Sequence, residues 1–289
     1  MLELNDASQF IEYFEKITER KVYRFPFCVS EGNKLAILMC KCNKTYISLP
    51  YLSQAIIETS PKEFDFTSLP KNWEIRDIQP HSNFLYTDKV IFEINLNQNY
   101  NPPTQIRRKI RKGKLNGIIV KQGTSEELLN DFYYVYSKRM HEIGVPPVSK
   151  KLIRKKLSIN ITQLFVAYKD NKPIGSATLD KLTSDYLENT YFATLSKFNS
   201  IYPSYALHNE MINYSKHKNA SIYSLGRCTK GSSVYNYKKH WKAQETQLYW
   251  SHSTKFKTLR NNKWLFTIWK HLPYSLTILL GGIIHKIVY

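Results

Sequence analysis

The order of the apolar segments in the second half of the chain limits its fold more than any other feature. A hairpin is predicted over QLFVAYKDNKPIGSATLDKL (163–182), because two strand-like runs flank a turn at Asp170-Asn171-Lys172. The run YLENTYFATL (186–195) adds a third strand, and helical patterns precede and follow this meander. Neither a regular strand–helix alternation nor a Gly-x-Gly-x-x-Gly turn occurs. The order therefore favours an α+β mixed sheet over a doubly wound nucleotide-binding fold.

The first half, to about residue 97, is also predicted to mix helix and strand. Asp6 is a suitable N-cap for a helix that runs to about Arg20, with apolar residues at helical spacing. Five strand candidates follow, with a turn at Glu31-Gly32-Asn33: FPFCVS, KLAILMCKC, TYISLP, NWEIRDI and KVIFEINL.

Three further helices are predicted from charge, capping and periodicity. The segment 101–117 is a charged helix, and Thr124 with Glu127 forms a capping box for the helix after it. Pro203 stands where the first turn of a third helix would begin.

The chain has 289 residues and a formal net charge of +19. This length suits one large domain or two modest ones. So strong a positive field attracts polyanions such as tRNA, nucleotide diphosphates or an anionic membrane, although a well-solvated basic surface is the alternative. The four cysteines form no Cys-x-x-Cys pair, so we expect free thiols and no metal.

Four segments follow one another in the order and spacing of FemAB-like transferases, and the chain resembles this family over roughly residues 85–289. The segments are PTQIRRKIRKGKLNGIIVKQG, MHEIGVPPVSKKLIRKKL, LFVAYKDNKPIGSATL and YSLGRCTKGSSVYNYKKHWKAQETQLYW. The chain is also similar to BioF2-like acetyltransferase domains and to the FemAB-related proteins of exopolysaccharide clusters. Family members commonly carry a Pro-aromatic segment with a glycine pair in the first half, but SLPYLSQAII (48–57) has no glycine.

The resemblance implies two GNAT-like lobes that face one cleft, with mixed sheets flanked by helices. We expect an N-terminal lobe over 1–97, which is degenerate or a true second lobe, a catalytic lobe over 98–260 and an amphipathic tail over 261–289. The implied reaction places an acyl or aminoacyl group on an amine of a cell-envelope precursor. That precursor would be an amino sugar or peptide linked to a nucleotide or a lipid. Family enzymes take aminoacyl-tRNA as donor.

The same resemblance singles out Lys238, because Gly231, Tyr237, Lys238 and Trp241 match a family segment whose lysine is thought to line the reaction centre. An ammonium held between two rings is partly desolvated, so it can stabilise an oxyanion or a phosphate. The alternative is a surface lysine beside core aromatics.

Other basic and polar residues are candidates for substrate binding. Arg227 at the end of a strand can fork onto phosphate or carboxylate, unless it forms an internal salt bridge. The loop that follows offers Lys230, Ser232 and Tyr235. Three arginines of the basic run at 107–114 are candidates for phosphate contacts, unless the run is a solvated helix face: Arg107, Arg108 and Arg111.

No general base can be chosen from the sequence. Six residues are candidates by residue type or by position near central strands: Asp180, Glu188, Glu210, His141, His208 and His240. Proton loss assisted by the substrate itself is the alternative.

The donor is expected to be a co-substrate, aminoacyl-tRNA or acyl-CoA, with no tightly bound cofactor. The junction SKFNSIYPSYALHNEM has no glycine turn of the kind that binds the CoA pyrophosphate, and Pro203 removes a backbone donor. Two alternatives remain: an acyl-CoA-dependent N-acetyltransferase of a surface polysaccharide pathway, and a noncatalytic basic protein that binds RNA or membranes.

The two ends of the chain bear on its location. The opening residues MLELNDASQF have no basic start and no apolar core, so we expect no secretory signal and a cytoplasmic protein. The tail mixes large apolar residues with lysines. It either packs on the body of the protein or associates peripherally with the inner face of the membrane.

Overall fold

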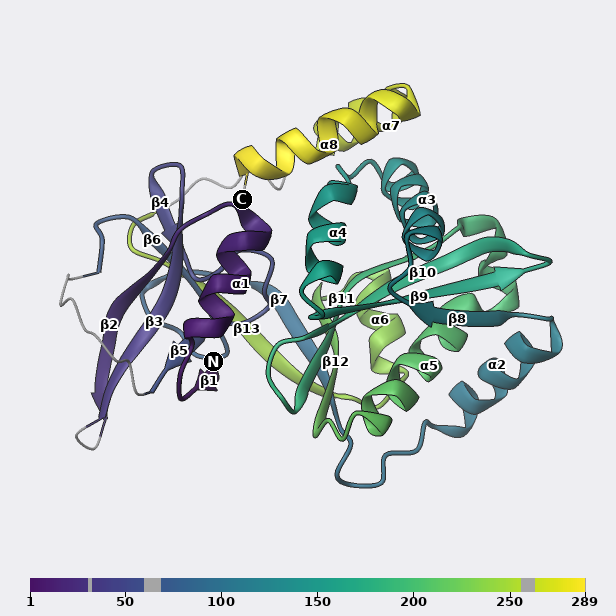
Figure 1. The fold of residues 1–289 in the computed structure, drawn as a ribbon, viewed down its shortest axis with the longest axis horizontal. Coiled ribbons are helices and arrows are strands. Elements are labelled where there is room, and N and C mark those ends of the chain that lie inside the picture. The colour runs from purple at the N-terminus through teal and green to yellow at the C-terminus, as the bar shows by residue number, and fades with distance from the viewer. Residues whose placement is uncertain (31–32, 60–68, 256–262, 289) are drawn as a thin grey trace.

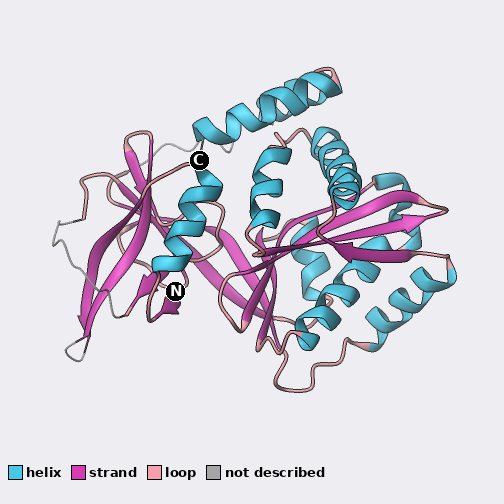
Figure 2. Cartoon of the chain, in the orientation of Figure 1, coloured by secondary structure: helices cyan, strands magenta, loops and turns pink. Residues whose placement is uncertain are grey.

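The computed structural model describes residues 1–30, 33–59, 69–255 and 263–288. One 13-stranded mixed sheet runs through both halves of the molecule (Figures 1 and 2). In spatial order its main path is β1-β5-β3-β4-β6-β13-β7-β12-β11-β10-β9-β8, and β2 pairs with β3 beside this path. The predicted α+β class with a mixed sheet flanked by helices is therefore confirmed.

The first half holds one described helix and six strands. They are β1 (Leu2–Leu4), α1 (Ser8–Thr18), β2 (Val22–Ser30), β3 (Asn33–Cys42), β4 (Thr45–Ile47), β5 (Ile56–Glu58) and β6 (Trp73–Asp77). Phe14 and Ile17 of α1 are buried, as their spacing predicts. The predicted cap differs: Ala7 is the N-cap, and Asp6 accepts a hydrogen bond from the backbone N–H of Ser8 at 2.8 Å. The turn predicted at 31–33 falls largely outside the described residues.

The second half carries the predicted meander and its helices. Its elements are β7 (Phe84–Asn95), α2 (Thr104–Leu115), β8 (Ile119–Gly123), α3 (Glu126–Ile143), α4 (Lys150–Ser158), β9 (Thr162–Lys169), β10 (Lys172–Lys181), β11 (Tyr186–Thr194), a 3₁₀ helix (Ser196–Ile201), α5 (Pro203–His217), β12 (Ile222–Thr229), α6 (Ser233–Lys239) and β13 (Gln244–His252). Helices α7 (Lys263–His271) and α8 (Tyr274–Val288) end the chain.

Turn and cap chemistry explains several of these boundaries. Asp170 and Asn171 join β9 to β10 with φ values of 50° and 58°, the left-handed conformation that Asp and Asn tolerate in a two-residue hairpin turn. Helix α3 begins after Ser125, whose hydroxyl accepts the N–H of Leu128 at 3.2 Å. The capping box predicted from Thr124 is therefore wrong by one residue. Both residues can accept the same bond, and only the backbone path selects one of them.

Helices cover both faces of the second-half sheet (Figure 1). One core lies under α2 and α5 and includes Phe165, Leu207 and the fully buried Trp241. The other lies under α3 and α4 and includes Phe132 and Ile153. Removing such side chains from water is the main stabilising contribution, about 1.5–3 kcal/mol for each large apolar residue.

Two long strands join the halves into one sheet. Strand β13 pairs with β6 on one side and with β7 on the other, and β7 pairs in turn with β12. Strand β7 ends at Asn95, close to the predicted boundary at residue 97. The division into 1–97, 98–260 and 261–289 stays a prediction.

Candidate active site

The parallel pairing of β11 and β12 ends in the middle of the sheet. The two strands pair over three residues only, and the last pair is Glu188 with Ser224. Beyond it β11 stays with β10, and β12 stays with β7. A parallel ladder that ends within a sheet leaves backbone groups without a strand partner and opens a gap between the strands.

Gly226 sits at this point because no other residue fits there. Its φ is +77°, and a Cβ would lie 2.5 Å from the carbonyl oxygen of Asn189. The register of β12 against β7 shifts between Ser224 and Arg227, as expected for a bulge that redirects the side chains after it.

A cavity of about 330 Å³ lies where the strands part, between the two halves. Residues of β11, β12, α5 and α6 line it together with the loop after β4 and the loop between α3 and α4. Its lining includes Tyr51, Ser53, Val145, Pro146, Val148, Glu188, Tyr191, His208, Arg227 and Lys238.

Lys238 lines this cavity and is only 6% exposed. Its ammonium donates to the backbone carbonyls of Gly226 at 2.8 Å and of Arg227 at 3.1 Å. An ammonium has three N–H donors, so these two bonds leave one donor for a ligand. Burial lowers the pKa of Lys238 to about 8, because desolvation disfavours the charged form. The sequence predicted a cation held between the rings of Tyr237 and Trp241 at a groove between the halves. Lys238 lines such a cavity, but its ammonium is held by two backbone carbonyls. Its catalytic role stays a prediction.

Glu188 faces the same cavity from β11 and is 3% exposed. The hydroxyl of Ser53 donates to its Oε1 at 2.8 Å, and the hydroxyl of Ser224 lies 3.4 Å from its Oε2. Burial raises the pKa of this carboxyl to about 7, although Ser53, Arg227 and Lys238 act in the opposite direction. The site therefore holds a carboxyl and an ammonium that both titrate close to neutral pH.

Arg227 lies beside this pair and connects it to the first half. Its guanidinium donates to the carbonyl of Leu52 at 2.5 Å and lies over the ring of Trp250, 5.6 Å from the ring centre. It lines the cavity. The positive charge of Arg227 opposes the raised pKa of Glu188 and adds to the lowering of the pKa of Lys238.

His208 is the second candidate base that reaches the cavity. It is 1% exposed, stacks on Phe192 with ring centres 4.5 Å apart, and shares a 2.6 Å hydrogen bond through Nδ1 with the hydroxyl of Tyr223. Burial holds the pKa of His208 well below its usual value, and the charge of Lys238 adds to this effect. The imidazole is therefore neutral at physiological pH.

The remaining candidate bases have other partners or lie elsewhere. Asp180 is buried against Lys156 and accepts bonds of 2.6 Å from Thr162 and Thr190. His141 bonds to the carbonyl of Leu272 at 2.9 Å, which holds the C-terminal helices against α3. Glu210 on α5 and His240 at the end of α6 are not among the residues that line the cavity.

The predicted loop residues do not line the cavity. Ser232 caps α6, since its hydroxyl accepts the N–H of Tyr235 at 3.1 Å. The hydroxyl of Tyr235 donates to Glu245 at 3.0 Å, and its ring packs on Phe92. Lys230 is exposed, and its backbone N–H donates a hydrogen bond to the carbonyl of Asp88 at 2.7 Å.

The basic run of α2 lies on the outer surface. Arg107, Arg108 and Arg111 are exposed and do not line the cavity, whereas Ile106 and Ile110 turn inward. The guanidinium of Arg107 donates to the carbonyl of Pro102 at 2.9 Å. The run is thus a solvated helix face that is open to a polyanion, and its binding role stays a prediction.

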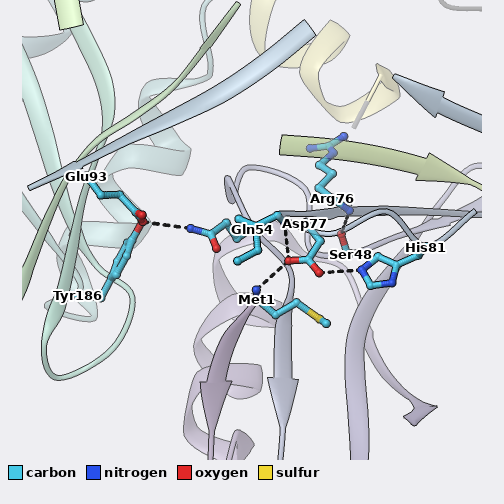
Figure 3. A network of polar contacts seen from close by, with 9 residues as sticks. Met1, Ser48, Gln54, Arg76, Asp77, His81, Glu93 and Tyr186 are labelled. Carbon is cyan, nitrogen blue, oxygen red and sulfur yellow. Dashed lines mark hydrogen bonds and ion pairs between the residues drawn. The ribbon is translucent and has the colours of Figure 1, made fainter. Parts of the chain in front are cut away.

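The resemblance implied a cleft between two lobes, but the sequence analysis named no site residue in the first half. Tyr51 and Ser53 line the cavity from SLPYLSQAII, the segment that lacks the glycine pair common in the family. Nearby, the amide of Gln54 donates to Glu93 at 3.2 Å, and Glu93 also accepts from Tyr186 (Figure 3). These bonds fix the loop against β7 and β11. The adjacent Pro50 and Tyr51 were the sequence signal that could have indicated the contribution of this segment to the site.

The junction before α5 holds no glycine turn. The 3₁₀ helix 196–201 leads to Tyr202, which has a φ of +69°, and Pro203 begins α5. The hydroxyl of Tyr237 donates to the carbonyl of Ser204 at 3.1 Å, so α6 packs against this end of the helix.

The described part of the chain contains no cluster of three or more His, Cys, Asp or Glu side chains that could hold a metal ion. Cys40, Cys42 and Cys228 are buried and form no disulfide with one another. None of the helices in the described ranges is both long and apolar enough to cross a bilayer.

Solved structures share this architecture over most of its length. The C-terminal domain of a protein assigned as a lysylphosphatidylglycerol synthetase from Agrobacterium fabrum matches with a TM-score of 0.57 and 11% identity, covering 87% of this chain and 88% of that domain. FemX matches with a TM-score of 0.55 and 10% identity over 84% of this chain and 90% of its own.

This chain has the fold of FemX. L-PGS from Bacillus licheniformis shares it as well, with a TM-score of 0.53 and 11% identity over 94% of this chain and 99% of its own. No protein-family model and no curated protein sequence matches the chain. At these identities the comparisons show the fold, which agrees with the FemAB-like and GNAT-like architecture expected from the sequence.

Proposed function

We propose that this protein is an acyltransferase that forms an amide by placing an acyl or aminoacyl group on an amine of a cell-envelope precursor. One observation carries the proposal: a buried lysine and a buried glutamate line one cavity between the two halves, and burial moves both pKa values toward neutrality. Buried pairs of this kind occur at catalytic sites because acid–base work at neutral pH requires such pKa values.

Glu188 acts as the base in this proposal. An amine reaches the site as an ammonium ion and must lose a proton before it can attack. The carboxylate of Glu188 takes that proton, and a pKa of about 7 suits the transfer at neutral pH. The neutral amine then attacks the carbonyl carbon of the donor and forms the new C–N bond.

Lys238 stabilises the oxygen that becomes negative during the attack. Two of its donors are fixed on the carbonyls of Gly226 and Arg227, so the ammonium is oriented before the substrate arrives. Such preorganised donors commonly contribute about 3–4 kcal/mol to catalysis. The intermediate then breaks the bond to the oxygen or sulfur of the donor, this leaving group takes the second proton from the attacking nitrogen, and the proton held by Glu188 passes to solvent as the amide is released. No covalent enzyme intermediate is needed.

The donor is proposed to be aminoacyl-tRNA, and acyl-CoA is the alternative. The glycine-free junction before α5, with Pro203 at its first position, supports this choice because it lacks backbone donors of the kind that bind a pyrophosphate. The exposed arginines of α2 suit a phosphate backbone. The A. fabrum neighbour is assigned by its name to the synthesis of a phosphatidylglycerol that carries a lysyl group, so transfer of an aminoacyl group to a lipid has a parallel on this fold.

The acceptor is proposed to be a glycan or peptide precursor on a nucleotide diphosphate or a lipid diphosphate, consistent with the net charge of +19. The test is to incubate the protein with charged tRNA or with acyl-CoA, each together with UDP-amino sugars or lipid-linked precursors, and to search for an amide product by mass spectrometry. We expect product with charged tRNA. Product with acyl-CoA alone would identify the acetyltransferase alternative. Absence of product with both donors, alongside tight RNA or vesicle binding, would identify a noncatalytic binding protein.

A further inference from the structure

The C-terminal helices α7 and α8 pack on the body through one side and expose large apolar residues on another. Their inner side packs on the body, where Trp269 and Thr277 are 7% and 1% exposed and Tyr274 shares a 2.7 Å hydrogen bond with Ser137 of α3. On the other side, Ile268, Leu276, Leu279 and Ile283 are 50%, 37%, 66% and 50% exposed. Because a helix in water normally turns a polar face outward, this outer apolar face requires a partner.

The spacing in α8 makes this face continuous. Leu276, Leu279 and Ile283 stand at positions i, i+3 and i+7, so they lie along one side of the helix. Thr277 and Gly281, which are buried, lie on the opposite side. The yellow helices α7 and α8 lie along one edge of the molecule, above α3 and α4 (Figure 1).

Helix α8 is seated directly on the wall of the cavity. A Cβ on Gly281 would lie 2.6 Å from the carbonyl oxygen of Pro147, and a Cβ on Gly282 would lie 3.0 Å from Cβ of Ser149. The neighbouring loop residues Val145, Pro146 and Val148 line the cavity. Whatever binds the outer face of α8 is therefore held one helix diameter, about 10–12 Å, from the loop that forms this wall of the cavity.

The charge of this segment selects the partner. After Glu245 the sequence contains no Asp or Glu, and it contains six basic residues: Lys255, Lys257, Arg260, Lys263, Lys270 and Lys286. An apolar face accompanied by basic residues alone complements an anionic lipid surface. A second copy of this chain is a poorer partner, because it would bring a like charge of +19 to the contact.

We propose that the face formed by Ile268, Leu276, Leu279 and Ile283 docks on the surface of an anionic phospholipid membrane and holds the cavity beside it. The docking itself is inferred from the geometry of α7 and α8. The further inference that the acceptor is lipid-linked rests on the proposed function.

The test is co-sedimentation of the full chain with vesicles, without donor or acceptor. The vesicles are phosphatidylcholine alone or with about 30% phosphatidylglycerol, and the salt is about 0.15 M or 0.5 M to separate charge from apolar insertion. We expect Leu279→Glu with Ile283→Glu to weaken binding at the higher salt by roughly tenfold or more. The matched control is Leu115→Glu with Ile119→Glu, which changes two apolar residues that are 76% and 64% exposed on α2 and β8. We expect this control to bind like the parent.

A second measurement does not depend on the folding of the glutamate variants. Leu279→Cys is labelled with an environment-sensitive fluorophore, with the parent protein labelled in parallel for background, since Cys40, Cys42 and Cys228 are buried. We expect the emission to shift to the blue with anionic vesicles, and a label at Leu115→Cys to stay unchanged.

Equal binding by both double variants, an unshifted label at position 279, or a dimer that the Leu279→Glu variant dissolves would each overturn the proposal. The result of the vesicle-binding test is independent of the result of the transferase assay. Vesicle binding through this face without any transferase product would sustain the docking and refute the proposed function, and the reverse pattern would do the opposite.

Discussion

Replacing the buried carboxyl of Glu188 by an amide is expected to make the protein more stable, and increasingly so as the pH rises. Glu188 has a folded-state pKa of about 7 against an ordinary value of 4.5. The folded protein therefore keeps a proton that the unfolded chain loses between these pH values. The stability that this proton provides is complete below pH 4.5 and is lost as the pH rises through 7.

The expected size follows from the two pKa values. Each pKa unit corresponds to about 1.36 kcal/mol, so the free energy of unfolding of Glu188→Gln minus that of the parent should rise by about 2.5 kcal/mol between pH 5 and pH 8.5. Glutamine keeps an oxygen that accepts the 2.8 Å bond from Ser53. The comparison therefore isolates the charge.

Urea unfolding followed by circular dichroism at pH 5, 7 and 8.5 measures this difference. The control is Glu126→Gln, which removes an exposed carboxyl whose pKa is lowered by its bond to Arg154. Its difference should stay nearly constant from pH 5 to 8.5, because a lowered pKa gives stability that is lost only as the pH falls below the ordinary value of 4.5. A difference for Glu188→Gln that stays constant with pH would refute the buried, near-neutral carboxyl.

Three further outcomes are expected. The pH dependence of kcat/KM should be bell-shaped, rising as Glu188 ionises near 7 and falling as Lys238 loses its proton near 8; a profile flat from pH 6 to 9 would contradict the assignment. Gly226→Ala should lower the free energy of unfolding by about 2 kcal/mol or more, measured by thermal unfolding. Gly231 has the same φ of +77° but open space around its Cβ, so Gly231→Ala should lower it by only about 1–2 kcal/mol. Equal losses would contradict the close contact of Gly226 with Asn189. Charge reversal of Arg108 should reduce the salt dependence of tRNA binding by about one counterion in a filter-binding assay, and an unchanged slope would exclude α2 from the RNA contact.

The fold class could be predicted from the sequence because local signals determine it. Strand–turn–strand periodicity predicted the meander β9–β11, and the Asp170-Asn171 turn has the left-handed backbone that those residues favour. The pairing of β13 with both β6 and β7 could not be read in this way. It joins segments far apart in the chain, and no local pattern records which edges meet.

The candidate site, like the fold, was predictable only where the signal is local in the sequence. The place of Lys238 at the cavity was predictable from the glycine and the two aromatics close to it in the sequence, whereas the two carbonyls that hold its ammonium were not. Glu188 was one of six candidate bases, and only the end of the β11–β12 ladder distinguishes it. Ser232 was taken as a pocket residue, yet a serine three residues before Tyr235 can cap a helix equally well. The tail packs on the body through one face, as one of the two sequence interpretations expected, and leaves a second apolar face outside; membrane association through that face stays a proposal.

Removal of the charge at position 238 tests the central claim most directly. The matched pair is Lys238→Met and Lys239→Met, since Lys238 is 6% exposed in the cavity whereas Lys239, its neighbour on α6, is exposed. The readout is the single-turnover rate of amide formation with the donor and acceptor found by mass spectrometry. We predict that Lys238→Met is slower by about a hundredfold to a thousandfold while folded, and that Lys239→Met matches the parent. Full activity in a folded Lys238→Met protein would contradict the account.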